Sequence, residues 1–140
     1  MSTSIVIKDS STGNEATVTE FGQLVVAPVD YSQPVAKELS EAGIAYNFIE
    51  PVSDKSIVIT DIILTANKGV GVNDATVSIY EAGGVDSVVS VTDILNLEMI
   101  KQSNLVLTGL NLIVPVGLFV NAQTDDASIF VTIMFYRVPI

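Results

Sequence analysis

The chain has 140 residues, of which 49% are apolar and only 16% charged, and its 16 acidic and 6 basic side chains give a net charge of −10. Its few cations are scattered singly, which excludes a basic nucleic-acid face, and the absence of cysteine and histidine excludes disulfides, thiolate metal sites and the commonest general base. A monomer of this size leaves about a third of its unfolded surface exposed, so the low charge content predicts apolar surface that meets another subunit or a partner.

Residues 1–43 are expected to form an N-terminal arm. Polar turn residues fill positions 8–17, and FGQLVVAPV at 21–29 predicts a short strand or hairpin. The segment YSQPVAKELSEAG at 31–43 contains the one helix candidate, because Ser32 offers a cap and a proline follows in the first turn. The arm should therefore contain at most one short helix.

Residues 44–140 are expected to form an all-β domain. Short apolar runs, alternating or rich in branched side chains, are separated by turn residues, and no stretch of a dozen residues has convincing helical periodicity. The runs are IAYNFIE (44–50), SIVITDIILTANK (56–68), ATVSIYE (75–81), SVVSVTDILNLEMI (87–100, ambiguous in its second half) and SIFVTIMFYRV (128–138). This pattern predicts a β-sandwich or jelly roll of about seven to nine antiparallel strands.

The uncharged stretch from Gln102 to Thr124 is 23 residues long, enough for a helix to cross a bilayer. Pro115 would interrupt such a helix near its centre, and three asparagines would need hydrogen-bonding partners within the membrane. Divided at its glycines and its proline, the stretch becomes pieces of strand length. We therefore expect uncharged strands between layers or at subunit contacts, and no membrane anchor.

No cluster of residues predicts catalysis, a metal site or a cofactor. Asp125 and Asp126 are adjacent, so on a strand they would point to opposite faces and not converge on one proton. The glycine-rich GVGVND at 69–74 lacks the Lys and Ser/Thr of a phosphate-binding loop and precedes a strand. Nucleophile, base and oxyanion donors are not identifiable, so no enzyme activity is expected.

The segment GNEATVTEFGQL (13–24) resembles a motif near the start of many tailed-phage virion proteins, roughly Gly-Asn-x-Ala-x-Val-x-x-x-Gly-x-Leu. The matching positions are Gly13, Asn14, Ala16, Val18, Gly22 and Leu24. Ile-Tyr-Glu (79–81) and Leu-Asn-Leu (110–112) then follow in the order found in β-sandwich modules of these proteins. The resemblance spans nearly the full chain, and its motifs carry no chemistry. It implies a capsid decoration (cement) protein, a head fibre or a small part of a tail fibre, commonly trimeric.

From this resemblance we expect a capsid decoration protein on the outer surface of a phage head. It would form a homotrimer and bridge neighbouring subunits of the major capsid protein, by burial of apolar surface and many weak contacts. The arm residues expected to contact the capsid are Phe21, Leu24, Val25 and Val26. The residues expected between subunits are Leu112, Val114, Pro115, Leu118 and Phe119, each of which could equally be ordinary core.

Two other functions remain open. A head-fibre or tail-fibre module would bind host glycans through the loops at one end of the sandwich and through tyrosines such as Tyr80 and Tyr136. A soluble carbohydrate-binding sandwich from outside viruses would use similar surfaces. Tyrosine is more often a packing residue than a sugar platform, and the chain has no tryptophan.

Overall fold

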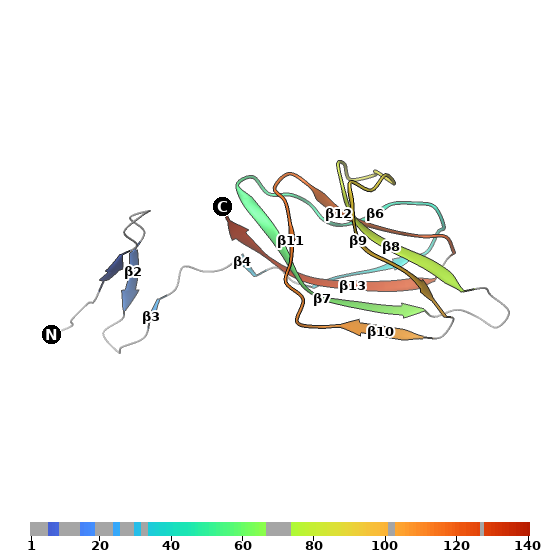
Figure 1. Cartoon of the computed structure of the whole chain (residues 1–140), viewed down its shortest axis with the longest axis horizontal. Coiled ribbons are helices and arrows are strands. Elements are labelled where there is room, and N and C mark those ends of the chain that lie inside the picture. The colour runs from blue at the N-terminus through green and yellow to red at the C-terminus, as the bar shows by residue number, and fades with distance from the viewer. Residues whose placement is uncertain are drawn as a thin grey trace.

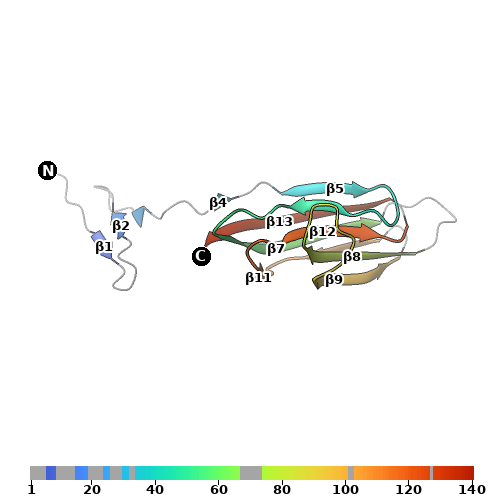
Figure 2. The same ribbon diagram turned by 90° about the horizontal axis from the view of Figure 1, so that it is seen from above.

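The computed structural model describes residues 6–8, 15–18, 24–25, 30–31, 34–66, 74–100, 103–126 and 128–140, with side chains from residue 34 onward. Within these ranges the protein is all-β and has no helix, and strands β4 to β13 form a sandwich of two antiparallel sheets, as the sequence predicts. In Figure 1 the four-stranded sheet lies above the six-stranded sheet. Figure 2 shows the strands of both sheets running along the long axis of the domain.

Two long strands, β7 (Lys55–Ala66) and β13 (Ile129–Pro139), form the centre of the six-stranded sheet. Both are rich in branched and aromatic residues, which pack well on a pleated surface. A bulge interrupts their ladder at Thr60, whose hydroxyl donates to the carboxylate of Asp61 at 2.7 Å. The carbonyl oxygen of Thr60 accepts a hydrogen bond from the backbone N–H of Leu110 at 2.8 Å, so the bulge also joins the loop between two edge strands.

Each central strand carries two short strands on its outer edge. Beyond β7 these are β10 (Asn104–Leu107) and β11 (Leu112–Val114), and beyond β13 they are β5 (Val35–Leu39) and β4 (Asp30–Tyr31). Both edges of this sheet are therefore made of pieces and not of one continuous strand.

The four-stranded sheet has the order β6 (Tyr46–Ile49), β12 (Phe119–Thr124), β8 (Ala75–Ala82) and β9 (Thr92–Met99). Strands β8 and β9 form a hairpin joined by residues 83–91, which we call the β8–β9 loop. The chain passes from one sheet to the other at most other connections. Residues distant in sequence therefore meet between the layers.

The hydrophobic core lies between the two sheets and follows the period of two expected of strands. On β8 alternate side chains enter the core, and Ala75, Val77 and Ile79 are fully buried. The six-stranded sheet contributes the other half of the core. Its fully or almost fully buried side chains include Leu39, Ile57, Ile59, Ile62, Leu64, Val114, Ile129, Val131 and Ile133.

The helix expected within residues 31–43 is wrong. Val35–Leu39 form β5, which pairs with β13 from Leu39 opposite Ile129 to Val35 opposite Ile133. A helix of this length is marginal in isolation, whereas the free edge of β13 satisfies the backbone hydrogen bonds of β5 and allows Leu39 to enter the core. β5 thus belongs to the six-stranded sheet, although it precedes the boundary at residue 44 expected from the sequence.

The described part of the uncharged stretch, residues 103–124, is confirmed as strands joined by turns. It contributes β10, β11 and β12, which lie in different sheets. Among the residues that the structure describes, no helix is long and apolar enough to cross a membrane.

Three short strands precede the sandwich. They are β1 (Val6–Lys8), β2 (Glu15–Val18) and β3 (Leu24–Val25), and they pair antiparallel in that order. The rest of the expected arm up to Tyr31 lies outside the described residues, apart from β4.

Candidate functional site

The residues expected to contact a capsid belong to the N-terminal segment. Phe21 and Val26 lie outside the described residues, and for Leu24 and Val25 the structure describes only the backbone of β3. Their role stays a prediction.

The five residues expected between subunits are divided between the surface and the core. Val114 is only 1% exposed and packs in the core of its own chain, because its position on β11 points between the sheets. Leu112 and Pro115 are exposed, whereas Leu118 and Phe119 are half-buried. An interface role stays a prediction for Leu112, Pro115, Leu118 and Phe119. Val114 is too deeply buried in its own chain to contact another subunit.

The outer face of the six-stranded sheet exposes several large apolar side chains. Because Ile129, Val131 and Ile133 enter the core, the alternate side chains of β13 point outward. On β10 and β11 the same alternation turns one apolar side chain of each strand outward. We call the exposed side chains Val106, Ile113, Phe130, Met134 and Val138 the apolar face.

The strand register connects this apolar face across the sheet. Val106 lies opposite Ile63, and Ile113 lies opposite Val58, so apolar side chains from the edge strands continue onto β7. Ile113 is 63% exposed and Val106 is 58% exposed, which makes them the most accessible members of the apolar face. Thr132 and Asp61 lie on the same face between these side chains. A group of exposed apolar side chains on one face marks an interaction site more often than a single apolar residue does.

The outer face of the four-stranded sheet differs, because the β8–β9 loop covers part of it (Figure 1, upper side of the domain). Asn121 on β12 holds the loop and is 0% exposed. Its amide nitrogen donates to the carbonyl oxygens of Gly84 at 3.0 Å and Ser87 at 3.1 Å. Its amide oxygen accepts from the amide of Asn47 at 3.0 Å, so β6 also contributes to the network.

Tyr80 lies in the same network and is 0% exposed. Its hydroxyl donates to the carbonyl oxygen of Ser87 at 2.8 Å, and burial raises the pKa of the phenol above its ordinary value of 10.0, which keeps it a donor. The ring is therefore not accessible to stack on a glycan, contrary to the tyrosine-based alternative. Tyr136 is half-buried on the other sheet.

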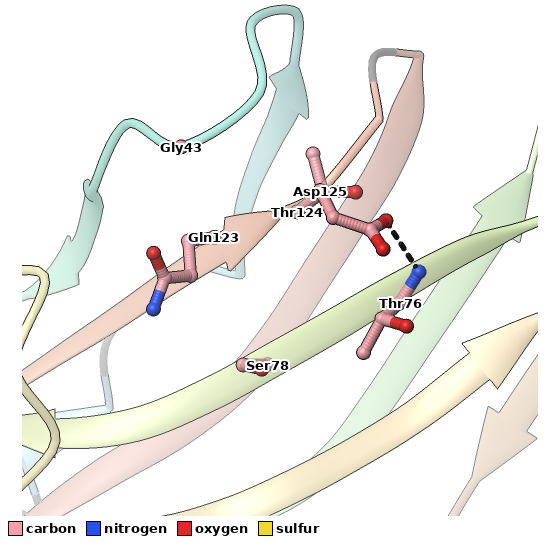
Figure 3. A pocket seen from close by; sticks show the side chains of 6 residues that line it. All are labelled: Gly43, Thr76, Ser78, Gln123, Thr124 and Asp125. Atoms are coloured by element: carbon pink, nitrogen blue, oxygen red, sulfur yellow. Dashed lines mark hydrogen bonds between the residues drawn. The ribbon is translucent and has the colours of Figure 1, made fainter.

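The part of the four-stranded sheet that the loop leaves open contains a polar depression of about 340 Å³. Figure 3 shows its six lining residues, Gly43, Thr76, Ser78, Gln123, Thr124 and Asp125. Thr76 and Ser78 come from β8, and Gln123 comes from β12. The carboxylate of Asp125 accepts a hydrogen bond of 2.7 Å from the backbone N–H of Thr76, drawn as the dashed line in Figure 3.

Groups suited to acid–base or metal chemistry are sparse. Within the described ranges, no three His, Cys, Asp or Glu side chains lie close enough together to hold a metal ion. Glu81 is a buried acidic residue, with 8% of its surface exposed. Burial raises the pKa of its carboxyl above the ordinary value of 4.5. It is not one of the residues that line the polar depression.

No protein-family model matches the chain, and comparison with curated proteins and with solved structures gave no match either. The resemblance to tailed-phage virion proteins therefore rests on the sequence motifs alone.

Sequence reasoning missed Ile113 and Asn121. Ile113 lies between two expected interface residues, Leu112 and Val114, and alternation would place it on the opposite face. Both faces of β11 are apolar, so the sequence does not show which face is the outer one. Asn121 could have been found from its polarity, because it is flanked by Val120 and Ala122 in a strand that enters the core.

Proposed function

We propose that the chain is a structural protein of a tailed-phage virion, a capsid decoration protein that forms a homotrimer. It would lie on the outer surface of the head and bridge neighbouring major capsid protein subunits. Copies of the chain would associate through the apolar face, and the N-terminal segment would contact the capsid. The observation that carries the association is the exposed apolar face of the six-stranded sheet.

The composition of the apolar face fits a contact between proteins. The cores of such contacts are depleted in charge and enriched in aromatic residues and methionine, as at Phe130 and Met134. Two acids are in register with them. Glu38, opposite Phe130 on the edge strand β5, would lie towards the polar rim. Asp61, opposite Met134 on the central strand β7, would lie within the contact, where its carboxylate accepts a hydrogen bond from the Thr60 hydroxyl. Burial of this patch between identical copies would remove apolar surface from water in a chain with few charged residues to cover it.

The proposed mechanism is binding without turnover. A net charge of −10 disfavours contact with the packaged nucleic acid and favours solubility. A trimer presents three N-terminal segments, so weak contacts with adjacent capsid subunits add up through a high effective concentration. Removal of one such segment from each copy should therefore abolish attachment without affecting association of the sandwich domains.

Ile113→Asp tests the association. The wild-type chain is expected to be a trimer by size-exclusion chromatography with light scattering. The variant should be monomeric, with a dissociation constant raised at least about 100-fold, because an unpaired charge in a dry contact costs several kcal/mol. Its circular dichroism should be unchanged, since Ile113 is exposed in the monomer.

The matched control is Val89→Asp, on the β8–β9 loop of the opposite sheet. Val89 is 70% exposed, so the same charge enters a surface of similar accessibility and the trimer should persist. A wild-type monomer, or a trimer that tolerates Ile113→Asp, would contradict the association.

Attachment is tested separately by co-sedimentation with expanded phage heads that lack their decoration protein. The wild-type chain should saturate a fixed number of lattice sites. A chain without residues 1–29 should remain trimeric and stay in the supernatant. Equal attachment of both chains would show that the N-terminal segment is not the contact, and no attachment of the wild-type chain would refute the decoration role.

A further inference from the structure

We propose that the polar depression on the four-stranded sheet is a binding site for a neutral saccharide. This site is separate from the apolar face and does not depend on the proposed association. It would give the protein a recognition function in addition to a structural one. The inference rests on the side chains that line the depression and on how the fold holds them.

The lining presents a two-by-two array of polar side chains. Thr76 and Ser78 are two residues apart on β8, so they point to the same face of the sheet. Gln123 on β12 lies directly opposite Ser78 in the register. Asp125 lies beside Thr76, because its backbone N–H donates to the carbonyl oxygen of Thr76 at 3.2 Å. Two hydroxyls and an amide thus lie on the adjacent strands β8 and β12, and the carboxylate follows directly after β12, as Figure 3 shows.

The fold orients the two strongest groups of this array. One carboxylate oxygen of Asp125 accepts from the backbone N–H of Thr76 at 2.7 Å, which leaves the other oxygen as an acceptor for a ligand. The amide nitrogen of Gln123 donates to the carbonyl oxygen of Val88 at 3.2 Å, which leaves the amide oxygen as a further acceptor. Both groups are held before a ligand arrives, and this reduces the entropic cost of binding.

Gly43 keeps the depression open on its third side. Its backbone N–H donates to the carbonyl oxygen of Thr124 at 2.9 Å, and its φ of +74° is one that glycine adopts without strain. A Cβ built at this position would meet nothing within 4 Å, so a side chain here would occupy open space. The absence of a side chain allows a ligand to approach the backbone.

The chemistry of the lining selects among ligands. No Lys or Arg is among the six lining residues, so an anion would meet only Asp125 and a chain of charge −10. A single carboxylate is too few charged ligands for a tightly held divalent cation. The lining also lacks large apolar side chains, which a lipid or drug-like molecule would need. Hydroxyl groups of a neutral sugar can both donate to Asp125 and accept from Thr76 and Ser78.

The volume agrees with a small ligand. About 340 Å³ lies near the lower end of the range of about 300–1,000 Å³ for ligand sites. One sugar ring, or one ring and part of a second, would fill it. With no aromatic platform in the lining, binding would depend on hydrogen bonds, and a Kd in the millimolar range is expected for a monosaccharide.

The test is a titration of the full chain, labelled with ¹⁵N, with glucose, galactose, mannose and N-acetylglucosamine in separate experiments. At least one sugar should shift backbone amide resonances within residues 74–78 and 123–126 in a saturable way. The double variant Thr76→Val and Ser78→Ala should raise the Kd for that sugar by about tenfold, since it removes two hydroxyls and keeps residues compatible with a strand.

Thr132→Val is the matched control, because Thr132 is a half-buried outward-facing hydroxyl on the six-stranded sheet. It should leave the Kd for the sugar unchanged. N-acetylneuraminic acid, which carries a carboxylate, should bind at least about tenfold more weakly than the best neutral sugar.

Three results would overturn the proposal. They are the absence of saturable shifts with all four neutral sugars, an unchanged Kd in the double variant, and equal binding of the anionic sugar. None of these results bears on trimer formation or attachment to heads, so failure of the saccharide site is distinguishable from failure of the proposed function.

Discussion

The side-chain amide of Asn47 donates a hydrogen bond of 3.0 Å to the amide oxygen of Asn121, 74 positions later in the sequence. This contact joins β6 to β12 on the outer face of the four-stranded sheet. Asn121 in turn donates to carbonyl oxygens of the β8–β9 loop. One buried amide thus connects two strands and a loop, and its loss should affect all three.

Asn121→Ala should lower the free energy of unfolding by roughly 2–3 kcal/mol, measured by urea denaturation. The variant removes the hydrogen bonds of Asn121 with Asn47, Gly84 and Ser87, and a typical hydrogen bond contributes about 0.5–1.5 kcal/mol net. Each of these three groups keeps one other partner: the carbonyl oxygen of Ile49, the N–H of Ser87 and the hydroxyl of Tyr80, respectively. Amide hydrogen exchange within residues 83–91 should also become faster, because the loop loses its attachment to the sheet.

Gln123→Ala is the control for this prediction. Gln123 lies on the same face of β12, is half-buried and makes one hydrogen bond to the same loop, to the carbonyl oxygen of Val88. Its loss should cost less than about 1 kcal/mol. Equal costs for the two variants would show that Asn121 is not the main anchor of the loop.

Glu81→Gln should stabilise the protein at neutral pH and not at low pH. Burial raises the pKa of the Glu81 carboxyl above 4.5, although a hydrogen bond with Thr92 acts in the opposite direction. The folded state therefore binds this proton more tightly than the unfolded chain does. The stability that the protonated group contributes is fully present below its ordinary pKa and is lost as the pH rises through the raised pKa.

The measurement is the Tm of both chains between pH 3 and pH 7. The difference between Glu81→Gln and wild type should be near zero at the acidic end and should grow as the pH rises. Glu98→Gln, at an exposed position on β9, is the control for the loss of one carboxylate. A constant difference across the range would mean that Glu81 does not titrate abnormally.

Gly117→Ala should lower the free energy of unfolding by about 1 kcal/mol. Gly117 occupies the third position of the turn between β11 and β12, in which the N–H of Leu118 donates to the carbonyl oxygen of Pro115 at 3.4 Å. Its φ of +86° lies in the left-handed region, where a Cβ is strained. Thermal or urea denaturation would detect the change.

Gly83→Ala serves as the comparison for Gly117→Ala. Gly83 is exposed, and its φ lies outside the left-handed region. A Cβ added at this position would have no neighbouring atom within 4 Å. The substitution should be neutral or should stabilise by up to about 1 kcal/mol, because it reduces the freedom of the unfolded chain. Destabilisation of equal size at both positions would exclude backbone strain as the cause.

The sequence was sufficient to predict the class of the fold and several of its strands. The branched run of β7 and the alternation of β8 are strong signals, because period two with buried Val and Ile is typical of a strand packed on a core. It was not sufficient for β5, whose Ala36, Lys37 and Glu38 favour a helix locally. In β5 the backbone pairing with β13, which is far away along the chain, outweighs this local preference for a helix.

The candidate surfaces were harder to predict for a related reason. On β11 neither face is polar, so the sequence does not distinguish the outward Ile113 from the inward Val114. Tyr80 follows the alternation of β8 and points away from the core, and only the β8–β9 loop, which covers it, makes it inaccessible. The polar depression combines β8, β12 and the turn at Gly43, and no local pattern links them.

The split edges of the six-stranded sheet bear on how the protein behaves at high local concentration. The central strands β7 and β13 have 12 and 11 residues, but no strand at either edge exceeds 5. Pro34, which lacks an amide hydrogen, immediately precedes β5. Short, interrupted edge strands offer few unpaired backbone N–H and C=O groups to an incoming chain. This discourages the growth of fibrils. Pairing of one copy with another through the sheet edges is therefore disfavoured when copies are crowded together.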